Sequence, residues 1–217
     1  MIPNYLLGDV LSLDTETAVL GDRVIEIGIS TFRNGELVNE WGMYVNPTVP
    51  IDPEASKVHN IYDKDVDSAP TFADIGWVIY NYINAADVIV AYNAAYDLEV
   101  LTKEFTRLGM RLPKKPMADP FIWYKHWNRY SKGKTLIKAT ETYGIPYVGA
   151  HRALNDATVT GKLLFKMAAI KNDFPKDVKS LITKQRKMVQ DQFEDLQAYF
   201  IKVGKGPIDP PEYRYYD

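Results

Sequence analysis

The sequence has no cysteine among its 217 residues. Disulfides, thiolate metal sites and cysteine nucleophiles are therefore excluded, and any metal ion must be bound by oxygen or imidazole ligands. An excess of positive charge is also lacking, because 26 Lys and Arg stand against 28 Asp and Glu, a formal net charge of −2. A protein that grips long nucleic-acid duplexes nonspecifically usually has a basic surface. If the ligand is nucleic acid, we expect a small, local contact.

Long hydrophobic runs are missing as well. No apolar run approaches the roughly 18 residues of a membrane-spanning helix. Residues 1–7 lack the charged start and the apolar stretch of a signal peptide. We therefore predict no membrane contact, and a cytoplasmic location, with which the absence of cysteine is consistent.

The hydrophobic pattern predicts an α/β domain. Apolar or β-branched runs predict strands, the first of them ending at Asp14, and Asn34-Gly35 is a strong hairpin signal. The predicted strands are residues 10–13, 24–32, 37–45 and 88–91, and the predicted helices are residues 72–83, 94–108, 135–143 and 152–170. The first three strands form an antiparallel meander, and the later alternation is typical of parallel strands covered by helices.

The last part of the chain has a different character. Residues 175–203 repeat apolar side chains at helical spacing, and a Pro- and Tyr-rich tail follows Gly204. We predict a boundary near residue 172, which separates a core domain, residues 1–172, from a C-terminal helical extension and tail, residues 173–217. The apolar stripe of this helix must be covered by another surface.

Four acids and one histidine stand out by position. Asp14 and Glu16 share one face of the first strand, roughly 7 Å apart along the chain. Two carboxylates this close repel each other unless they are protonated or bridged by a cation. Taken alone, this pair is more often a polar turn at a strand end.

The other three candidates are Asp97, His151 and Asp156. Asp97 follows a buried strand, at the end where open α/β sheets bind ligands, although a helix N-terminus also favours an acid. His151 precedes a helix, and Asp156 lies just over one turn inside it. The alternative for Asp156 is an i,i+4 ion pair with Arg152.

Taken together and in order, these residues resemble the DEDD exonuclease superfamily in its histidine-containing (DEDDh) branch, and they are similar to the epsilon-type proofreading subunits of bacterial DNA polymerase III. The resemblance covers about residues 8–170. The motifs that carry it are Leu13-Asp14-Thr15-Glu16-Thr17, Asp52-Pro53-Glu54-Ala55, Val58-His59-Asn60-Ile61, Asn93-Ala94-Ala95-Tyr96-Asp97 and His151-Arg152-Ala153-Leu154-Asn155-Asp156-Ala157.

The resemblance implies an RNase H-like fold, in which helices flank a mixed five-stranded sheet. It also implies that Asp14, Glu16, Asp97 and Asp156 hold two divalent cations, Mg²⁺ or Mn²⁺, and that His151 is the general base. The residue types suit this chemistry, because hard cations prefer oxygen ligands and a histidine can take a proton near neutral pH.

The resemblance further implies contacts with the terminal nucleotide. The implied substrate residues are Thr15, Glu16, Glu54, His59, Asn93 and Tyr96. For His59, a plain helix-end residue is an equally good interpretation. His126 sits among aromatic residues, and we expect it to pack or to meet solvent. The basic stretch 125–138, with Trp127 and Tyr130 interleaved, has two interpretations: a single-strand-binding surface or a solvated loop.

The predicted function is therefore a metal-dependent 3′→5′ exonuclease acting on single-stranded or frayed DNA 3′ ends, releasing nucleoside 5′-monophosphates, with proofreading as its role. Two alternatives stay open: an RNA 3′-end-trimming exoribonuclease, and a non-catalytic nucleic-acid-binding module. Three surfaces are possible packing partners for the apolar stripe of the C-terminal helix: the core of the same chain, a second copy in a homodimer, and a polymerase or other replication partner.

Overall fold

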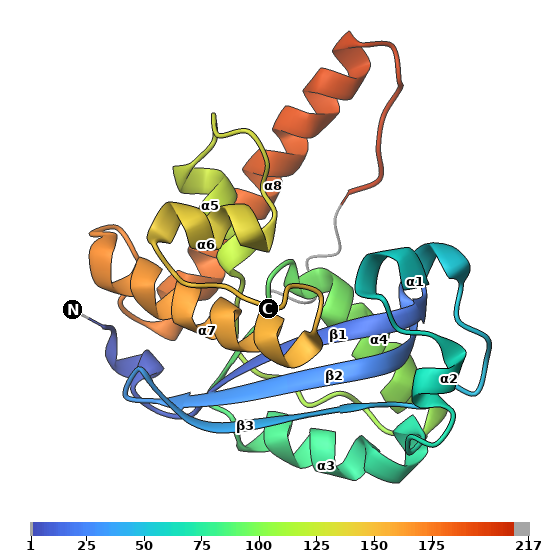
Figure 1. Cartoon of the computed structure of the whole chain (residues 1–217). Coiled ribbons are helices and arrows are strands. Elements are labelled where there is room, and N and C mark those ends of the chain that lie inside the picture. Colours follow the sequence, from blue (N-terminus) through green and yellow to red (C-terminus); the bar gives the residue numbers. More distant parts are fainter. Residues whose placement is uncertain (1, 211–217) are drawn as a thin grey trace.

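The computed structural model describes residues 2–210 and is built on one mixed sheet (Figure 1). The five strands lie in the order β3-β2-β1-β4-β5. Their bounds are β1 Val10–Val19, β2 Asp22–Arg33, β3 Glu36–Tyr44, β4 Val88–Val90 and β5 Met117–Ala118. Strand β2 pairs antiparallel with both β1 and β3, and β4 and β5 run parallel to β1. The predicted RNase H-like sheet is confirmed.

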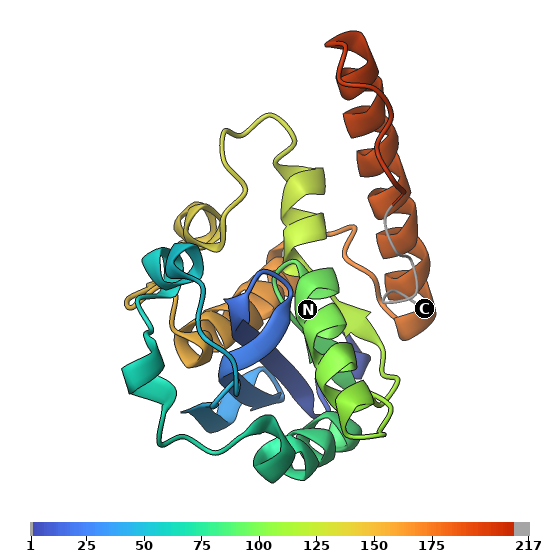
Figure 2. The same ribbon diagram turned by 90° about the vertical axis from the view of Figure 1, so that its right-hand side faces the viewer.

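The helices cover both faces of this sheet. Their bounds are η1 Asn4–Leu6, α1 Pro53–His59, α2 Asp63–Val66, α3 Phe72–Ala85, α4 Ala94–Arg107, α5 Pro120–Trp127, α6 Leu136–Tyr143, α7 Ala153–Ile170 and α8 Val178–Lys202. Helix α7 lies along one face of β1 and β2, while α3 and α4 lie on the other side (Figures 1 and 2). The rings of Phe72 in α3 and Phe105 in α4 pack edge to face, with their centroids 5.4 Å apart.

Strand β1 is longer than its sequence predicts. The apolar run ends at Leu13, but pairing with β2 continues as far as Val19 opposite Asp22, with a bulge between Glu16 and Thr17. The predicted strand end at Asp14 is therefore wrong, because neighbouring strand β2 supplies hydrogen bonds that local hydrophobicity does not reveal. Parallel pairing with β4 stops at Ser12. Beyond that point β1 is flanked by β2 alone.

The hairpin between β2 and β3 forms at the predicted turn. Asn34 and Gly35 both have positive φ, 54° and 83°. Two successive left-handed residues match the strand twist, which is why Asn-Gly is favoured there. The other predicted strands and helices are confirmed with small changes at their ends. Helices α1, α2 and α5 and the two-residue strand β5 had no prediction from the hydrophobic pattern.

Helix α8 begins against the body of the molecule and then extends away from it (Figures 1 and 2). Its first half is buried at Leu181, Gln185, Met188 and Val189, whereas Leu196 and Val203, further along the predicted stripe, are almost half exposed. The core of the same chain therefore covers only the first half of the predicted stripe. The division at residue 172 stays a prediction, and the last residues of the Pro/Tyr-rich tail, 211–217, lie outside the described residues. Within residues 2–210, no helix has the length and apolarity of a membrane span.

Candidate active site

Two of the predicted acids lie on the part of β1 that β4 does not accompany. Asp14 is opposite Gly28 of β2, and Glu16 is opposite Glu26. Both acids are partly accessible to solvent, while Thr15 between them is buried. Because residues two apart in a strand share a face, Asp14 and Glu16 lie on the same side of the sheet.

Helix α4 brings the third acid, Asp97. Asn93, with φ of 67°, turns the chain from β4 into α4, and Asp97 lies in the first turn with 3% of its surface exposed. Its Oδ1 accepts hydrogen bonds from the N–H of Thr15 at 2.9 Å and from the Thr15 hydroxyl at 2.8 Å. The residue between the two acids of β1 therefore holds Asp97 beside them.

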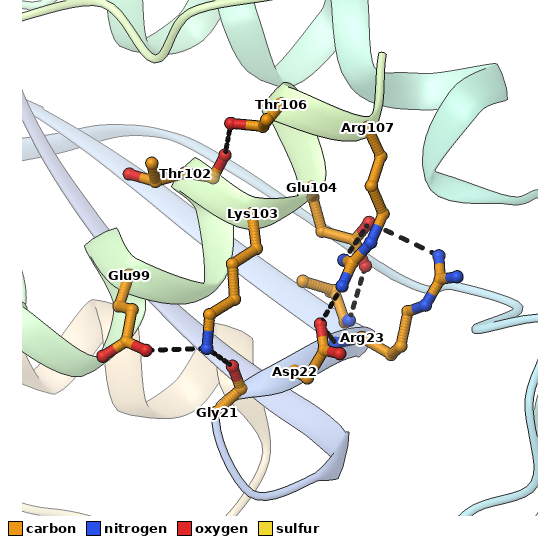
Figure 3. Close-up of polar contacts among 10 residues, drawn as sticks. Gly21, Asp22, Arg23, Glu99, Thr102, Lys103, Glu104, Thr106 and Arg107 are labelled. Carbon is orange, nitrogen blue, oxygen red and sulfur yellow. Dashed lines mark hydrogen bonds and ion pairs between the residues drawn. The ribbon is translucent and has the colours of Figure 1, made fainter. Parts of the chain in front are cut away.

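Polar contacts also join α4 to the turn between β1 and β2 (Figure 3). Lys103 donates to the carbonyl oxygen of Gly21 at 2.8 Å, and Arg107 pairs with Asp22. The buried Glu104 accepts from the N–H of Val24 at 3.1 Å and pairs with Arg107 at 3.1 Å. The helix that carries Asp97 is thus fixed to the β1–β2 turn and to the start of β2, the strand that pairs with β1.

Helix α7 brings the fourth acid, Asp156, and it comes unusually close to the sheet. A Cβ atom at Gly28 would lie 2.2 Å from backbone atoms of Ala153 and Leu154. Only glycine admits this approach at Gly28. The start of α7 therefore lies directly on β2, and Asp156, which is 8% exposed, follows within its first turn.

His151 lies in the loop just before α7 and has a left-handed backbone, with φ of 63°. The next residue fixes this loop. Arg152 donates to Glu26 Oε1 from Nε at 3.0 Å and from Nη2 at 2.8 Å, and the N–H of Ala153 donates to Glu26 Oε2 at 3.2 Å. Arg152 thus pairs with Glu26 of β2, and not with Asp156 as the alternative interpretation had it.

Burial raises the pKa of all four acids, and neighbouring acids raise those of Asp14 and Glu16 further. Burial and the charges of Asp97, Asp156, Glu16 and Glu26 raise the pKa of Asp14 well above its usual range. Burial, followed by the charges of Asp156 and Glu26, raises the pKa of Glu16 to about 8. Burial raises the pKa of Asp97 to about 7, and it also raises that of Asp156. This concentration of negative charge needs protons or cations to be stable.

One group of side chains is already arranged like metal ligands. Ligand atoms of Glu16, His151 and Asp156 lie within 4.8 Å of one another. A further residue contacts the group, because the Tyr147 hydroxyl donates to Asp156 Oδ1. His151 is thus close to the acids, where it is able either to accept a proton or to bind an ion.

A pocket of about 300 Å³ opens beside these acids. His59 is one of its walls and is buried. Its Nδ1 accepts from the N–H of Ile61 at 3.0 Å, so Nε2 carries the hydrogen of the neutral ring. Burial lowers the pKa of His59, while the nearby backbone of Thr17 opposes that shift. Nε2 makes no hydrogen bond of normal geometry within residues 2–210. The pocket is lined by Glu16, Thr17, Leu20, Asp52, Glu54, Ala55, Val58, His59 and Tyr96.

The predicted substrate residues divide into two groups. Glu16, Glu54, His59 and Tyr96 line this pocket together. Asn93 and Thr15 do not line it: the N–H of Asn93 donates to Asp119, and both donors of Thr15 are bound to Asp97. Substrate contact stays a prediction for both groups.

The model of the RNase T family, described as an exonuclease family, matches residues 11–164. The chain belongs to the RNase T exonuclease family. The predicted superfamily is thereby confirmed, since this family is a DEDD exonuclease family.

Curated relatives of this exonuclease chain are much longer than it is. It is 29% identical over 145 residues to the 3′-5′ exonuclease DinG of Staphylococcus epidermidis, which covers 67% of this chain and 16% of the relative. It is 27% identical over 165 residues to a PolC-type DNA polymerase III of Caldanaerobacter subterraneus, covering 75% of this chain and 12% of the relative. The chain therefore spans a small part of these relatives.

Solved structures of exonucleases share the fold. An exonuclease X in complex with 5′-overhanging duplex DNA has a TM-score of 0.60 and 25% identity, over 74% of this chain and 92% of that one. Exonuclease I of E. coli with single-stranded DNA has a TM-score of 0.71 and 16% identity, over 82% and 43%. A 3′-exonuclease specific for a histone mRNA stem-loop has a TM-score of 0.62 at 15% identity, over 75% and 64%. The last two similarities bear on the fold alone.

Three residues around the acids of this exonuclease domain were not predicted from the sequence: Glu26, Gly28 and Tyr147. Glu26 gave a usable signal, since it is the one acid in the otherwise apolar and β-branched run 24–32. Gly28 lies in the same run, where a glycine often marks a close approach of another backbone. Tyr147 gave none, because it lies in an irregular loop.

No residue of the basic stretch 125–138 is among those that line the pocket. Trp127 packs on Trp123, with ring centroids 5.1 Å apart, and its Nε1 donates to Asp173 at 3.0 Å. His126 is exposed, as predicted, and Tyr130 is 95% exposed. Trp127 is therefore a packing residue, which favours the solvated-loop interpretation for this stretch.

Proposed function

We propose that this chain is a divalent-cation-dependent 3′→5′ exonuclease that hydrolyses the terminal phosphodiester of a DNA strand and releases nucleoside 5′-monophosphates. The observation that carries the proposal is the convergence of Asp14, Glu16, Asp97 and Asp156, from three separate elements, beside His151. The family supports the reaction class.

The donor set fits divalent cations. Asp14, Glu16, Asp97 and Asp156 offer only carboxylate oxygens, and burial raises the pKa of all four, because a buried carboxylate is costly to ionise without a cation beside it. These four acids would hold two ions, Mg²⁺ or Mn²⁺. Two such ions supply activation of a water molecule and neutralisation of charge on the phosphate and the leaving oxygen.

His151 has the position that a general base requires. Its imidazole lies within reach of Glu16 and Asp156 and is open to solvent. It would accept the proton of the attacking water, a role that typically contributes roughly 10²–10⁴-fold to the rate. The pairing of Glu26 with Arg152 anchors the loop in which His151 lies.

The pocket beside the acids would receive the terminal nucleotide. Its volume of about 300 Å³ is at the small end of the range for ligand pockets. His59 Nε2 offers a buried donor, which has no partner of normal geometry in the part of the chain that the structure describes. Glu54 and Tyr96 would contact the nucleotide from the same pocket, while Thr15 would act from the middle of β1 and Asn93 from the N-cap of α4.

DNA is the proposed substrate because exonuclease X, which is similar over most of its length, was solved with duplex DNA. The relationship to a PolC-type polymerase supports association with a replication polymerase and a proofreading role. The proposed place of action is the cytoplasm.

The test compares strands of one sequence as single-stranded DNA, blunt duplex DNA and RNA, at physiological salt and below saturation. We expect the single-stranded DNA to be shortened fastest. A protein with a net charge of −2 attracts the DNA phosphates weakly, so binding offsets little of the free energy that separating the two strands of a duplex costs. Asp14→Asn is the control for contaminating nucleases. Faster loss of RNA would favour the exoribonuclease alternative, and no loss of any strand would favour a binding module.

A further inference from the structure

The first half of α8 is tied to the sheet edge by one fully buried side chain, Gln185. Its Oε1 accepts from the N–H of Asp119 at 2.9 Å and from the Trp123 indole at 2.8 Å. Its Nε2 donates to the carbonyl oxygen of Met117 at 3.0 Å. Gln185 thus joins α8 to the end of β5 and the start of α5.

Asp119, the residue that Gln185 contacts, serves two helices with one carboxylate. It is the N-cap of α5, where Oδ1 accepts from the N–H of Phe121 at 2.9 Å. The same carboxylate accepts from the N–H of Asn93 at 3.0 Å and from the N–H of Ala94 at 2.9 Å. These are backbone donors at the start of α4 that have no partner inside the helix.

The start of α4 determines where Asp97 lies. Asn93 does not cap the helix with its own side chain and has a left-handed backbone, with φ of 67°. Asp119 takes over the capping, and a negative charge is favoured at this end of a helix. Asp97 follows in the same turn and meets Thr15 of β1. A shift of Asp119 would therefore shift the proposed cation ligand.

We propose that Gln185 is a positioning residue for the exonuclease site, through which α8 fixes Asp119, the start of α4 and hence Asp97. Gln185 lies beyond residue 164, where the match to the exonuclease family ends. The extension is on this account part of the catalytic framework, and removal of residues 173–217 costs activity. The inference rests on the proposed exonuclease function for its kinetic consequence only.

Gln185→Met tests the inference, because methionine keeps the size of glutamine and removes all three hydrogen bonds. Two matched controls lie on the same helix. Gln192→Met removes a single bond, to the carbonyl oxygen of Ile122 at 3.0 Å, and leaves Asp119 untouched. Leu181→Ala removes a fully buried side chain and lowers stability without breaking a hydrogen bond of Asp119.

The direct measurement is amide hydrogen exchange by NMR in the full chain. In Gln185→Met we expect the amides of Asn93 and Ala94 to exchange at least about tenfold faster than in the parent, while amides within α7 keep their rates. Neither control changes Asn93 and Ala94 selectively. Unchanged exchange at these two amides in folded Gln185→Met overturns the inference, whether or not the protein cuts DNA.

The kinetic measurement uses a single-stranded oligonucleotide well below the melting temperature of each variant. We expect kcat to fall about 10-fold or more in Gln185→Met, the scale found when the supporting partners of metal ligands are removed, with little change in KM. A fall no larger than that of Leu181→Ala means that stability alone is affected, which contradicts the inference. If the parent itself cuts no strand, the proposed function fails and the exchange data still decide.

A milder variant covers the case in which Gln185→Met does not fold. Gln185→Glu keeps an acceptor oxygen for Asp119 and Trp123 and loses the donor to Met117. The new carboxylate is buried close to that of Asp119 and repels it, so we expect exchange at Asn93 and Ala94 to be faster than in the parent. Parent-like exchange in this variant counts against the inference.

Discussion

Replacement of Gly28 by alanine should separate α7 from the sheet and thereby disturb the acids. The added Cβ would lie 2.2 Å from backbone atoms of Ala153 and Leu154, whereas ordinary contact begins at 3.4 Å. The start of α7 therefore has to move by about 1 Å, because backbone atoms cannot rotate out of the way as a flexible side chain can. Asp156 is in the first turn of that helix, and His151 precedes it.

The size of the effect follows from that displacement. Overpacking a well-packed site costs about 1–3 kcal/mol of stability. A misplacement of about 1 Å in a catalytic group costs roughly 10²-fold in rate. We therefore expect Gly28→Ala to fold with a lower melting temperature and to lose about 100-fold in kcat on a single-stranded oligonucleotide.

Gly161→Ala is the matched control. Its Cβ would lie 2.2 Å from the Phe32 ring, between the same helix and the same strand, but further along α7 from Asp156. We expect a comparable loss of stability and a much smaller loss of kcat. If Gly28→Ala is folded and as active as the parent, or if the two variants lose kcat equally, the close approach at Gly28 does not set the geometry of the site.

Three further predictions concern charges around the acids. Glu26→Gln weakens the pairing with Arg152 that anchors the His151 loop. We expect kcat to fall roughly tenfold with KM unchanged, as for other supporting partners of a metal site. An unchanged kcat at saturating Mg²⁺ would contradict the role of this pairing as an anchor of the loop. Asp156→Asn should abolish hydrolysis. It should also remove most of the rise in melting temperature that Mn²⁺ gives the parent, because a ligand bound only to the folded state stabilises that state. Full activity of the purified variant would contradict the role of Asp156 as a cation ligand. In EDTA, the free energy of unfolding should fall as pH rises from about 6.5 to 8. In the folded state the pKa is about 8 for Glu16 and about 7 for Asp97, well above the values in the unfolded chain. The folded state therefore binds more protons than the unfolded state in this pH range, and loses stability as they dissociate. Saturating Mg²⁺ should flatten this dependence, and thermal melts that are flat or rise with pH in EDTA would show that the pKa values of Glu16 and Asp97 are not raised in the folded state.

The order of motifs was enough to predict the fold and the five central residues. The sequence allowed these five residues to be identified, because the chemistry restricts each position to particular residue types in strands and at helix starts. They are Asp14, Glu16, Asp97, His151 and Asp156. The structure places Glu16, His151 and Asp156 in one group and ties Asp97 to Thr15. Their predicted roles as ligands and base stay predictions.

The surroundings of the site were not predictable in the same way. The length of β1 depends on pairing with β2, and the close approach at Gly28 depends on a helix more than 120 residues later in the chain. Gln185 looks like any polar residue of an amphipathic helix, and only the packed structure shows that it is fully buried. Long-range packing of this kind leaves no local pattern in the sequence.

The central claim is that the acids beside His151 hydrolyse a strand from its 3′ end. The most direct measurement follows a 5′-labelled single-stranded DNA with Mg²⁺, using the parent and Asp14→Asn. The account predicts that the labelled strand shortens one nucleotide at a time from the 3′ end, that nucleoside 5′-monophosphates accumulate, and that Asp14→Asn produces neither. Early release of the label as a mononucleotide, internal cuts, or full activity in Asp14→Asn would contradict it.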